Sequence, residues 1–363
     1  MKCPHCQRDI RYRERSGRQC PQCRKRFAFE PREGDLLSDL AFKSLLDRLS
    51  DQGTLAWNTR QLQHALRRPF QRQQFKQRQG LIIGSLFGGL VLGVIGFNLL
   101  PSVLWLLLML GGGSVTARLI YRQFKASPFL PLSRTEAETL LQRWEAVHGP
   151  ATGKLSPPQL KPATGDKNPL SESYNVGQAL ICDRPETVAF LLANDFHIEQ
   201  RCAILSVGGY PPDDFEGLRQ MLKRNPQLNV FVLHDASYNG CQLYHTLITE
   251  PDWFKGSKRV FDLGLFPRHA QRLRGHWTAA GASYQRTPLP GYSEADNIWL
   301  QHHELSLMAL PPKTLLKQIQ RLLSRHAQQA SEAYARDDES GWEFESEDLL
   351  RIGEIGDSDS DFG

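Results

Sequence analysis

The sequence predicts a multidomain protein that combines a small four-cysteine metal-binding unit, a two-helix transmembrane hairpin and a C-terminal α/β domain with a mostly parallel sheet. Three observations predict this fold class. Two Cys-x-x-Cys pairs open the chain, a long uncharged stretch fills residues 81–117, and strand-like and helix-like segments alternate after residue 171. A chain of 363 residues is long enough for several folded units. We expect seven segments: residues 1–30, the metal-binding unit; 31–79, a basic helical segment; 80–121, the transmembrane hairpin; 122–148, a helical segment; 149–170, a Pro/Gly linker; 171–335, the α/β domain; and 336–363, an acidic disordered tail.

The N-terminal unit is predicted from the spacing of its cysteines. Its candidate metal ligands are Cys3, Cys6, Cys20 and Cys23. Two thiolates on one tight turn that face two on another supply four soft ligands for a tetrahedral zinc ion. A unit of this size buries too little core to fold alone, so the metal supplies much of its folding energy. The pattern resembles the zinc-ribbon family, and a structural zinc ion with no open coordination position is expected.

Charge is distributed unevenly along the chain. The net charge is +5, but residues 1–80 carry an excess of about ten positive charges and the tail from Ser331 an excess of about ten negative charges. Basic side chains surround the cysteine pairs together with Tyr12 and Phe27, a mixture that suits phosphate contact and base stacking. Anionic lipid headgroups explain the same basic residues. Nucleic acid and anionic lipid are therefore both candidate partners of the basic N-terminus.

Helices are expected on both sides of the uncharged stretch. Apolar residues recur at spacings of three and four between Leu37 and Leu49, which is typical of an amphipathic helix. A polar and basic helix is expected over residues 59–79. Residues 133–148 are expected to form a helix capped by Ser133. The Pro and Gly content of residues 149–169 then indicates a flexible or extended linker.

The uncharged stretch is too long for one membrane crossing and suits two. A bilayer core is roughly 30 Å thick and takes about 20 apolar residues per helix. We expect crossings over residues 81–97 and 102–117, joined by a turn at Pro101. Basic residues flank both crossings, so the positive-inside bias predicts an integral membrane protein with both termini in the cytoplasm. Glycine pairs such as Gly84 and Gly88 favour self-association of the helices. The alternative is a hairpin buried in a soluble core.

Beyond the linker, short apolar runs alternate with helical patterns. Strands are expected over residues 179–182, 202–207, 230–234 and 259–263. Helices are expected over residues 186–194, 213–224, 240–249 and 268–275, with a closing helix over 312–335. This alternation predicts a parallel sheet with helices on both faces. Ligands of such sheets gather at the carboxyl ends of the strands, so chemistry is expected there.

Residues 234–248, HDASYNGCQLYHTLI, resemble the strand-turn-helix of Toprim domains, especially those of topoisomerase VI and the related meiotic recombination nuclease. In that family an acidic pair ends a strand and a glycine opens the next helix. Asp235 matches the first acid and Gly240 the glycine, and Asp183 stands where the family has a glutamate after its first strand. Ser237 replaces the second acid of the pair. Because clustered carboxylates hold Mg²⁺ in Toprim chemistry, the resemblance implies a degenerate catalytic site. The residues alone also allow a generic doubly wound domain in which Asp235 caps a helix.

Three functions are compatible with these features. The favoured one is a membrane-anchored binding or scaffold protein that contacts the lipid bilayer and an unknown protein partner, with a structural zinc ion and a non-catalytic α/β domain. Its ligand-binding candidates are Asp183, Asp235, Ser237 and Gly240. The second is a Mg²⁺-dependent nuclease or other phosphoryl-transfer enzyme that acts on nucleic acid near the membrane, with Asp183, Asp235 and Glu186 as its candidate catalytic carboxylates. The third is a purely structural membrane assembly protein.

Overall fold

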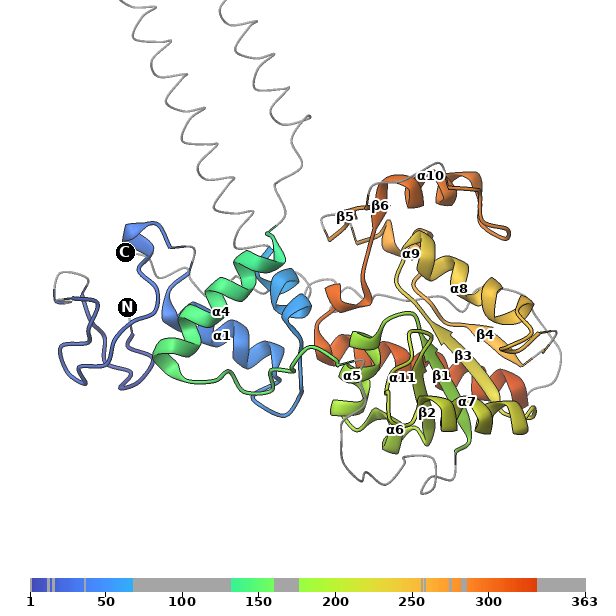
Figure 1. The fold of residues 1–363 in the computed structure, drawn as a ribbon. Helices are drawn as coiled ribbons and strands as arrows, with labels where there is room; N and C mark the ends of the chain where they lie inside the picture. Colours follow the sequence, from blue (N-terminus) through green and yellow to red (C-terminus); the bar gives the residue numbers. More distant parts are fainter. Residues whose placement is uncertain are drawn as a thin grey trace, which may run out of the picture.

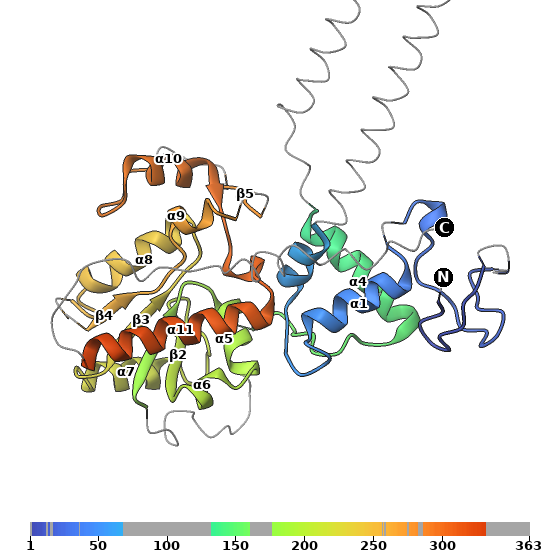
Figure 2. The ribbon, with the colours of Figure 1, turned by 180° about the vertical axis from the view of Figure 1, so that it is seen from behind.

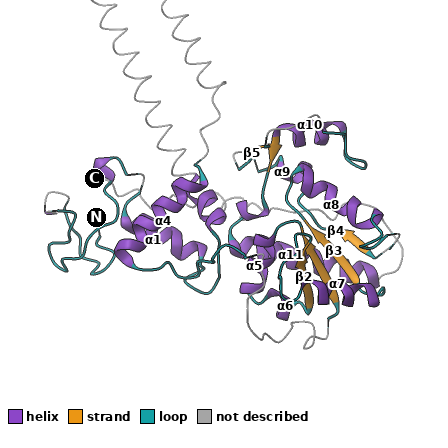
Figure 3. Cartoon of the chain, in the orientation of Figure 1, coloured by secondary structure: helices purple, strands orange, loops and turns teal. Residues whose placement is uncertain are grey.

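The computed structural model describes two lobes, a mostly helical N-terminal one and a C-terminal one built on a sheet (Figure 1). The described residues are 2–11, 14, 17–35, 37–67, 132–159, 176–255, 257, 259–273, 276–281 and 286–331. Figure 3 shows the strands of the main sheet gathered in the C-terminal lobe, while helices and loops make up the other lobe.

The C-terminal lobe contains a four-stranded, entirely parallel sheet, which confirms the predicted parallel-sheet α/β domain. Its strands are β1 (Gln178–Cys182), β2 (Cys202–Ser206), β3 (Asn229–Leu233) and β4 (Val260–Asp262), in the spatial order β2-β1-β3-β4. The central strands are almost wholly buried. They are near-continuous apolar runs because both faces of a parallel sheet are covered by helices.

Side chains of β1 alternate between two apolar cores, one on each face of the sheet. Leu180 and Cys182 pack with α5 (Pro185–Ala193) and α11 (Pro312–Ser331), whereas Ala179 and Ile181 pack with α7 (Phe215–Arg224) and α8 (Tyr238–Thr249). Figure 2 shows α11 crossing in front of the strands. The short helix α6 (Phe196–Glu199) packs beside β2. The sheet is therefore the middle layer of three.

The chain reverses its winding direction at the central strand β1. From β1 it passes through α5 to β2 on one side, and then through α7 to β3 on the other side of β1. The carboxyl ends of β1 and β3 therefore form the topological switch point of the sheet. In open α/β sheets this is where ligands bind.

A small substructure covers this end of the sheet. It contains α9 (Pro267–Ala270), α10 (Glu294–His302), the 3₁₀ helix η4 (Leu307–Ala309) and a short antiparallel pair, β5 (Thr278–Ala279) with β6 (His303–Glu304). Ala236 and Leu305 exchange two backbone hydrogen bonds of 2.9 Å. These bonds hold the segment before η4 against the end of β3.

The helical lobe packs segments that are far apart in sequence into one core. It contains η2 (Pro31–Glu33), α1 (Asp39–Leu49), a helix over residues 59–67, and α4 (Arg134–His148). Ser133 caps α4 through a capping box with Glu136, as its sequence predicts. The shared core includes Phe29, Phe42, Trp57, Leu66 and Trp144.

Part of the predicted linker is bound to this helical core. The amide of Trp57 donates to the carbonyl of Gly153 at 2.8 Å, and the amide of Leu155 donates to the carbonyl of Trp57 at 2.8 Å. Gly153 has φ +74°, and a Cβ there would lie 2.4 Å from the Leu55 carbonyl oxygen, so this position requires glycine. Residues 160–170 of the predicted linker lie outside the described residues.

The predicted transmembrane hairpin is wrong, because no helix in the described ranges combines the length and the apolar character that a bilayer crossing needs. The helix α11 has 20 residues but carries a basic residue at every fourth position from Lys313 to Arg325. The same finding overturns the predicted membrane anchor and the integral-membrane localisation with two crossings and cytoplasmic termini. The expected crossings, residues 81–97 and 102–117, lie outside the described residues, as does the expected acidic tail, 336–363.

Candidate functional site

The two cysteine pairs lie on two turns with the same backbone structure. In the first, the amide of Gln7 donates to the carbonyl of Cys3 at 2.9 Å, and in the second the amide of Arg24 donates to the carbonyl of Cys20 at 2.9 Å. Gln7 and Arg24 occupy equivalent positions and both have left-handed backbone, with φ of 56° and 54°. The two knuckles are therefore near copies of one another.

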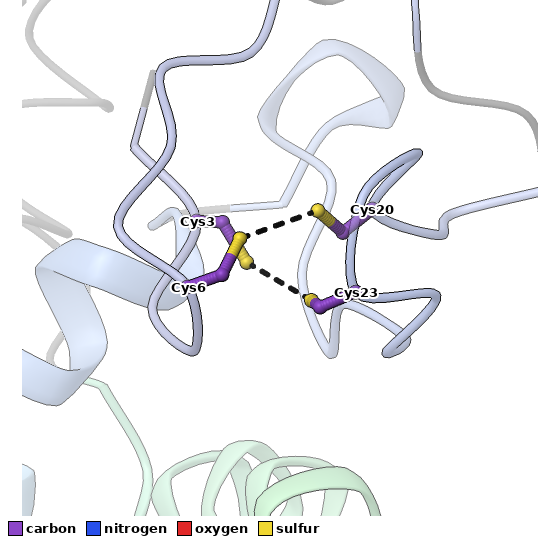
Figure 4. A group of neighbouring side chains, drawn as sticks. All are labelled: Cys3, Cys6, Cys20 and Cys23. Atoms are coloured by element: carbon purple, nitrogen blue, oxygen red, sulfur yellow. Dashed lines mark hydrogen bonds between the residues drawn. The ribbon is translucent and has the colours of Figure 1, made fainter.

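The four sulfur atoms converge on one point between the knuckles (Figure 4). The Sγ atoms of Cys3 and Cys23 are 3.7 Å apart, as are those of Cys6 and Cys20, and all four lie within 4.8 Å of one another. These separations are far longer than a disulfide bond of about 2.05 Å. A tetrahedral zinc ion with Zn–S bonds of about 2.3 Å separates its sulfur ligands by about 3.8 Å. The four cysteines thus can bind one metal ion, consistent with zinc.

Burial raises the pKa of these thiols, whereas hydrogen bonds from backbone amides lower it. Burial raises the pKa of Cys3 to about 12. Burial also raises the pKa of Cys20, but the backbone amides of Cys23 and Gln22 outweigh it and bring that pKa down to about 7. A cation at the centre of the four sulfurs would favour the thiolate of each.

The metal-binding unit is attached to the helical lobe through a stack of rings. The ring of His5, inside the first knuckle, stacks on His148 of α4 at 4.8 Å, and His148 stacks on Trp144 at 3.9 Å. His148 Nε2 lies 2.5 Å from a carboxylate oxygen of Asp39. Asp39 is fully buried and also accepts hydrogen bonds from the amides of Ala28 and Phe29. Sequence reasoning missed Asp39, because an acid in the first turn of a helix is usually only a favourable charge there.

The second site lies at the carboxyl ends of β1 and β3, where Asp183 and Asp235 meet. Oδ2 of Asp183 accepts a hydrogen bond from the backbone amide of Asp235 at 3.0 Å. Oδ1 of Asp235 accepts two, from the amide of Leu307 at 2.7 Å and from Oγ of Ser306 at 3.2 Å. We call Asp183, Arg184, Asp235, Ser306 and Leu307 the strand-end cluster.

Arg184 supplies the positive charge of this cluster. Its Nε lies 2.5 Å from Oδ2 of Asp235 and 3.9 Å from Oδ2 of Asp183. Burial lowers the pKa of Arg184, but the charges of Asp235 and Asp183 raise it above its ordinary value. Burial, followed by the charge of Asp235, raises the pKa of Asp183 to about 7. The guanidinium thus takes the place that a metal cation takes between carboxylates.

Ser237 and Gly240 lie beside the same cluster. Oγ of Ser237 caps α8 by accepting a hydrogen bond from the amide of Gly240 at 3.1 Å. The cap of this helix is therefore Ser237, not Asp235 as the generic alternative supposed. A Cβ at Gly240 would lie 2.4 Å from the carbonyl oxygen of Asp235 and 3.2 Å from Oδ2 of Asp183. The structure thus brings the four candidate ligand-binding residues together.

Glu186 does not join the other two candidate carboxylates. It lies in the first turn of α5 and its carboxylate is 3.9 Å from the guanidinium of Arg60, in the helical lobe. In the part of the chain that the structure describes, the four cysteines are the only group of three or more His, Cys, Asp or Glu side chains placed to hold a metal ion. Asp183, Asp235 and Glu186 therefore form no three-carboxylate site.

His234 is a further residue of this region that sequence reasoning missed. It is fully buried, with Nδ1 2.8 Å from the carbonyl oxygen of Asp235 and Nε2 3.0 Å from Oδ1 of Asp262. Burial lowers its pKa, but the carboxylate of Asp262 raises it well above the ordinary value. A Cβ at Gly264 would lie 2.0 Å from Nε2 of His234, so only glycine fits there. His234 fixes the backbone of Asp235, and a histidine that ends an apolar run carries no sequence signal for this role.

Comparisons of this chain with family models, with curated proteins and with solved structures gave no match. The function of the two sites therefore has to be inferred from their own residues and geometry.

Proposed function

We propose that this protein is a nucleic-acid-binding or scaffold protein without catalytic turnover, in which a zinc ribbon carries the binding surface and a Toprim-like α/β domain has lost its metal chemistry. The observation that carries the proposal is that groups of the protein itself occupy both oxygens of the Asp235 carboxylate. One of its oxygens accepts hydrogen bonds from Leu307 and Ser306, and the other is paired with Arg184.

The loss of metal chemistry follows from the needs of Mg²⁺. This ion demands near-octahedral oxygen ligands and retains several water molecules. Only 1% of the Asp235 side chain is exposed, so hydrated Mg²⁺ has little access to it. The guanidinium of Arg184 repels a divalent cation at the same place. Ser237 contributes no carboxylate and is committed to the cap of α8.

The assignment of a zinc ribbon and a Toprim-like domain is supported by local geometry. The repeated knuckles and the 3.7 Å sulfur separations suit a four-thiolate zinc ion. Adjacent parallel strands that are followed closely by Asp183 and Asp235 suit the acidic positions of a Toprim domain. These features support the resemblance to both families.

The binding surface that we propose is the exposed basic side of the ribbon. The positively charged side chains that are exposed there are Lys2, Arg8, Arg11, Arg18, Arg24, Lys25 and Arg26. Two of them are engaged within the protein, Arg8 with Gln22 and Arg18 with Glu33. A rigid, metal-stabilised surface with this charge suits contact with a phosphate backbone.

One experiment tests both parts of this proposal. The full chain is incubated with labelled single-stranded and duplex DNA and RNA, with and without Mg²⁺, and binding and cleavage are measured together. We expect binding that weakens steeply as salt rises, because phosphate contacts release counterions, and no Mg²⁺-dependent cleavage. The double substitution Arg24→Gln and Lys25→Gln should weaken binding, whereas the matched change Lys223→Gln and Arg224→Gln on α7 should not. Mg²⁺-dependent cleavage that Asp235→Asn abolishes would show that the protein is an enzyme, and binding that is independent of salt would exclude phosphate contacts.

A further inference from the structure

The helix α11 carries a row of basic side chains along its length. The members are Lys313, Lys317, Arg321 and Arg325, each four residues after the one before. Lys313 and Lys317 are exposed, and Arg321 and Arg325 are half-buried. Because an α-helix rises about 1.5 Å per residue, neighbouring members are about 6 Å apart along the axis and the row is about 18 Å long. We call these four residues the basic row of α11.

The basic row does not serve the stability of its own helix. α11 contains no acidic residue, so no member of the row has an oppositely charged neighbour one turn away in the helix. Like charges four residues apart destabilise a helix. Lys313 also lies in the first turn, where the helix dipole is unfavourable to a cation. The row is therefore an arrangement that negative charge from outside α11 would stabilise.

One residue of the helical lobe supplies such a charge at the start of the row. An oxygen of the Asp51 carboxylate lies 2.9 Å from Nζ of Lys313. Lys317, one turn further along, is exposed and forms no ion pair with a residue that the structure describes. The row thus offers a place for an anion beside Lys317.

The sequence that follows α11 is strongly acidic. The helix ends at Ser331, and residues 337–348, DDESGWEFESED, contain seven acids and no basic residue. Twelve extended residues span about 40 Å at about 3.3 Å each, which is more than twice the length of the row. A turn reverses the chain within four residues, so residues 332–336 are enough to bring these acids back beside α11.

The course of α11 favours this row over the basic side of the ribbon as the partner of the acids. The helix starts beside the helical lobe, where Lys313 pairs with Asp51, and further along His326 lies against Phe261 of the edge strand β4, with ring centroids 5.6 Å apart. It therefore runs away from the helical lobe and the ribbon (Figure 2). A segment that starts at its far end meets the row before it reaches the ribbon. The short tether gives an effective concentration in the millimolar range, at which weak exposed ion pairs act together.

We propose that the basic row of α11 is the docking surface for residues 337–348 of the same chain. The carboxylates of this segment bring negative charge beside Lys317 and the two arginines that follow it. Since these charges are at least partly exposed, the contact weakens as salt rises.

Zero-length cross-linking of the full chain tests this docking. A carbodiimide joins a carboxylate directly to a lysine amine, so only groups in contact are linked, and mass spectrometry of the digest identifies each pair. The link between Lys313 and Asp51 is the internal positive control. We expect Lys317 to be linked to acids of residues 337–348, with a yield that falls severalfold at about 1 M salt, where the Debye length is about 3 Å. The proposal is overturned if Lys317 is not linked to this segment, or if the segment is linked to Lys2 or Lys25 of the ribbon instead.

The same reaction on a mixture of isotope-labelled and unlabelled chains shows which copy the segment contacts. Links within one chain contain a single isotope. Links that contain both would place the segment on a second copy of the protein and would overturn the proposal.

Matched variants outside the two lobes separate docking from general attraction. Neutralisation of three acids next to the helix should reduce the links between Lys317 and the remaining acids of residues 337–348 severalfold. Neutralisation of three acids near the end of the sequence removes the same charge and should leave these links unchanged. An equal effect of the two triple variants would contradict a specific contact. The first variant combines Asp337→Asn, Asp338→Asn and Glu339→Gln, and the second combines Asp357→Asn, Asp359→Asn and Asp361→Asn.

Discussion

The carboxyl group of Asp183 lies in surroundings that oppose its charge. It is buried at the end of β1 beside the negative charge of Asp235, and one of its oxygens, Oδ1, accepts no hydrogen bond from the described chain. Its other oxygen, Oδ2, accepts the hydrogen bond from the Asp235 amide. The raised pKa of about 7 is the measurable result of this arrangement.

Asp183→Asn is expected to stabilise the protein above neutral pH. The folded pKa of about 7 lies above the ordinary value of 3.8, so the folded state favours the protonated acid. The stability contributed by that proton is present below about pH 4 and is lost as pH rises through 7. Asparagine keeps the acceptor for the Asp235 amide without the charge. The variant should therefore gain on the order of 1 kcal/mol at pH 8, and this gain should shrink towards pH 5.

Thermal unfolding of the parent and the variant between pH 5 and pH 8 measures this effect. Asp252→Asn is the control, because its side chain is 84% exposed and removal of its charge changes little. A difference between Asp183→Asn and the parent that is constant across this range would mean that Asp183 is ionised throughout.

Sequence reasoning located the acids of this cluster but not the cation. Asp183 and Asp235 each follow an apolar run, and parallel strands bring such positions to one edge. The partners of Asp235 could not be read in this way, because Leu307 follows it by 72 residues and its amide is placed by a contact of η4 with the end of β3. Nothing in the sequence distinguishes Arg184 from any other charged residue that precedes a helix. The carboxylate of Glu186 lies near Arg60 and not with the two aspartates.

At the scale of elements, the knuckles of the ribbon are the part best specified by local sequence. The backbone hydrogen bonds of each turn join residues four or five apart, and the fold of the pair then depends on what lies between the four sulfurs. Cys3, Ile10, Cys20 and Phe27 form the buried apolar cluster of this unit. So small a core provides little stability without a metal.

Cys20→Ser is expected to remove zinc from the full chain and to unfold the ribbon. Metal analysis should find one zinc per parent chain and a large loss in the variant, because a serine hydroxyl is a poor ligand for zinc at neutral pH. Cys202→Ala is the control, since Cys202 lies in β2 and takes no part in the cluster. Its zinc content should equal that of the parent. A parent chain without stoichiometric zinc, or a Cys20→Ser variant that retains it, would contradict the assignment.

The regular elements of the α/β domain follow closely from their patterns, whereas the central hairpin was a wrong prediction. Strands β1 to β3 begin and end within one residue of the expected ranges, since buried apolar runs and the helices between them carry strong periodic signals. The expected crossings rested on the length and hydropathy of an uncharged stretch and on its basic flanks, and the described helices contain no span of the required character. The packing of α4 against α1 could not be predicted either, because periodicity shows which face of a helix is buried but not its partner.

At the scale of the whole molecule, a few polar contacts join the two lobes. The side chain of Asn194 accepts a hydrogen bond from the amide of Ala56 at 2.8 Å and donates one to its carbonyl at 3.2 Å. Lys313 of α11 pairs with Asp51, but both side chains are largely exposed. The paired amide contact should therefore contribute more to the junction than the ion pair does.

Asn194→Ala is expected to weaken the docking of the helical lobe on the α/β domain. Loss of both hydrogen bonds should cost about 1–2 kcal/mol, because the Ala56 backbone groups lose their partner. Hydrogen exchange at residues 53–58 should become faster while exchange within β1 and β3 stays slow. Lys313→Ala should change exchange at the same residues much less. Equal effects of the two substitutions would show that the amide pair does not dominate the junction.

The bridge between Trp57 and residues 153–155 also bears on how the chain folds as it is synthesised. The metal-binding unit lies within the first 30 residues, so its four cysteines are synthesised long before α4 is. The apolar side of α1 has to wait, because Trp144 and the strand-like segment that covers Trp57 emerge about one hundred residues later. During that interval Phe42 lacks the contact with Trp144 that completes its core, and a nascent chain at this stage is a natural client for a chaperone.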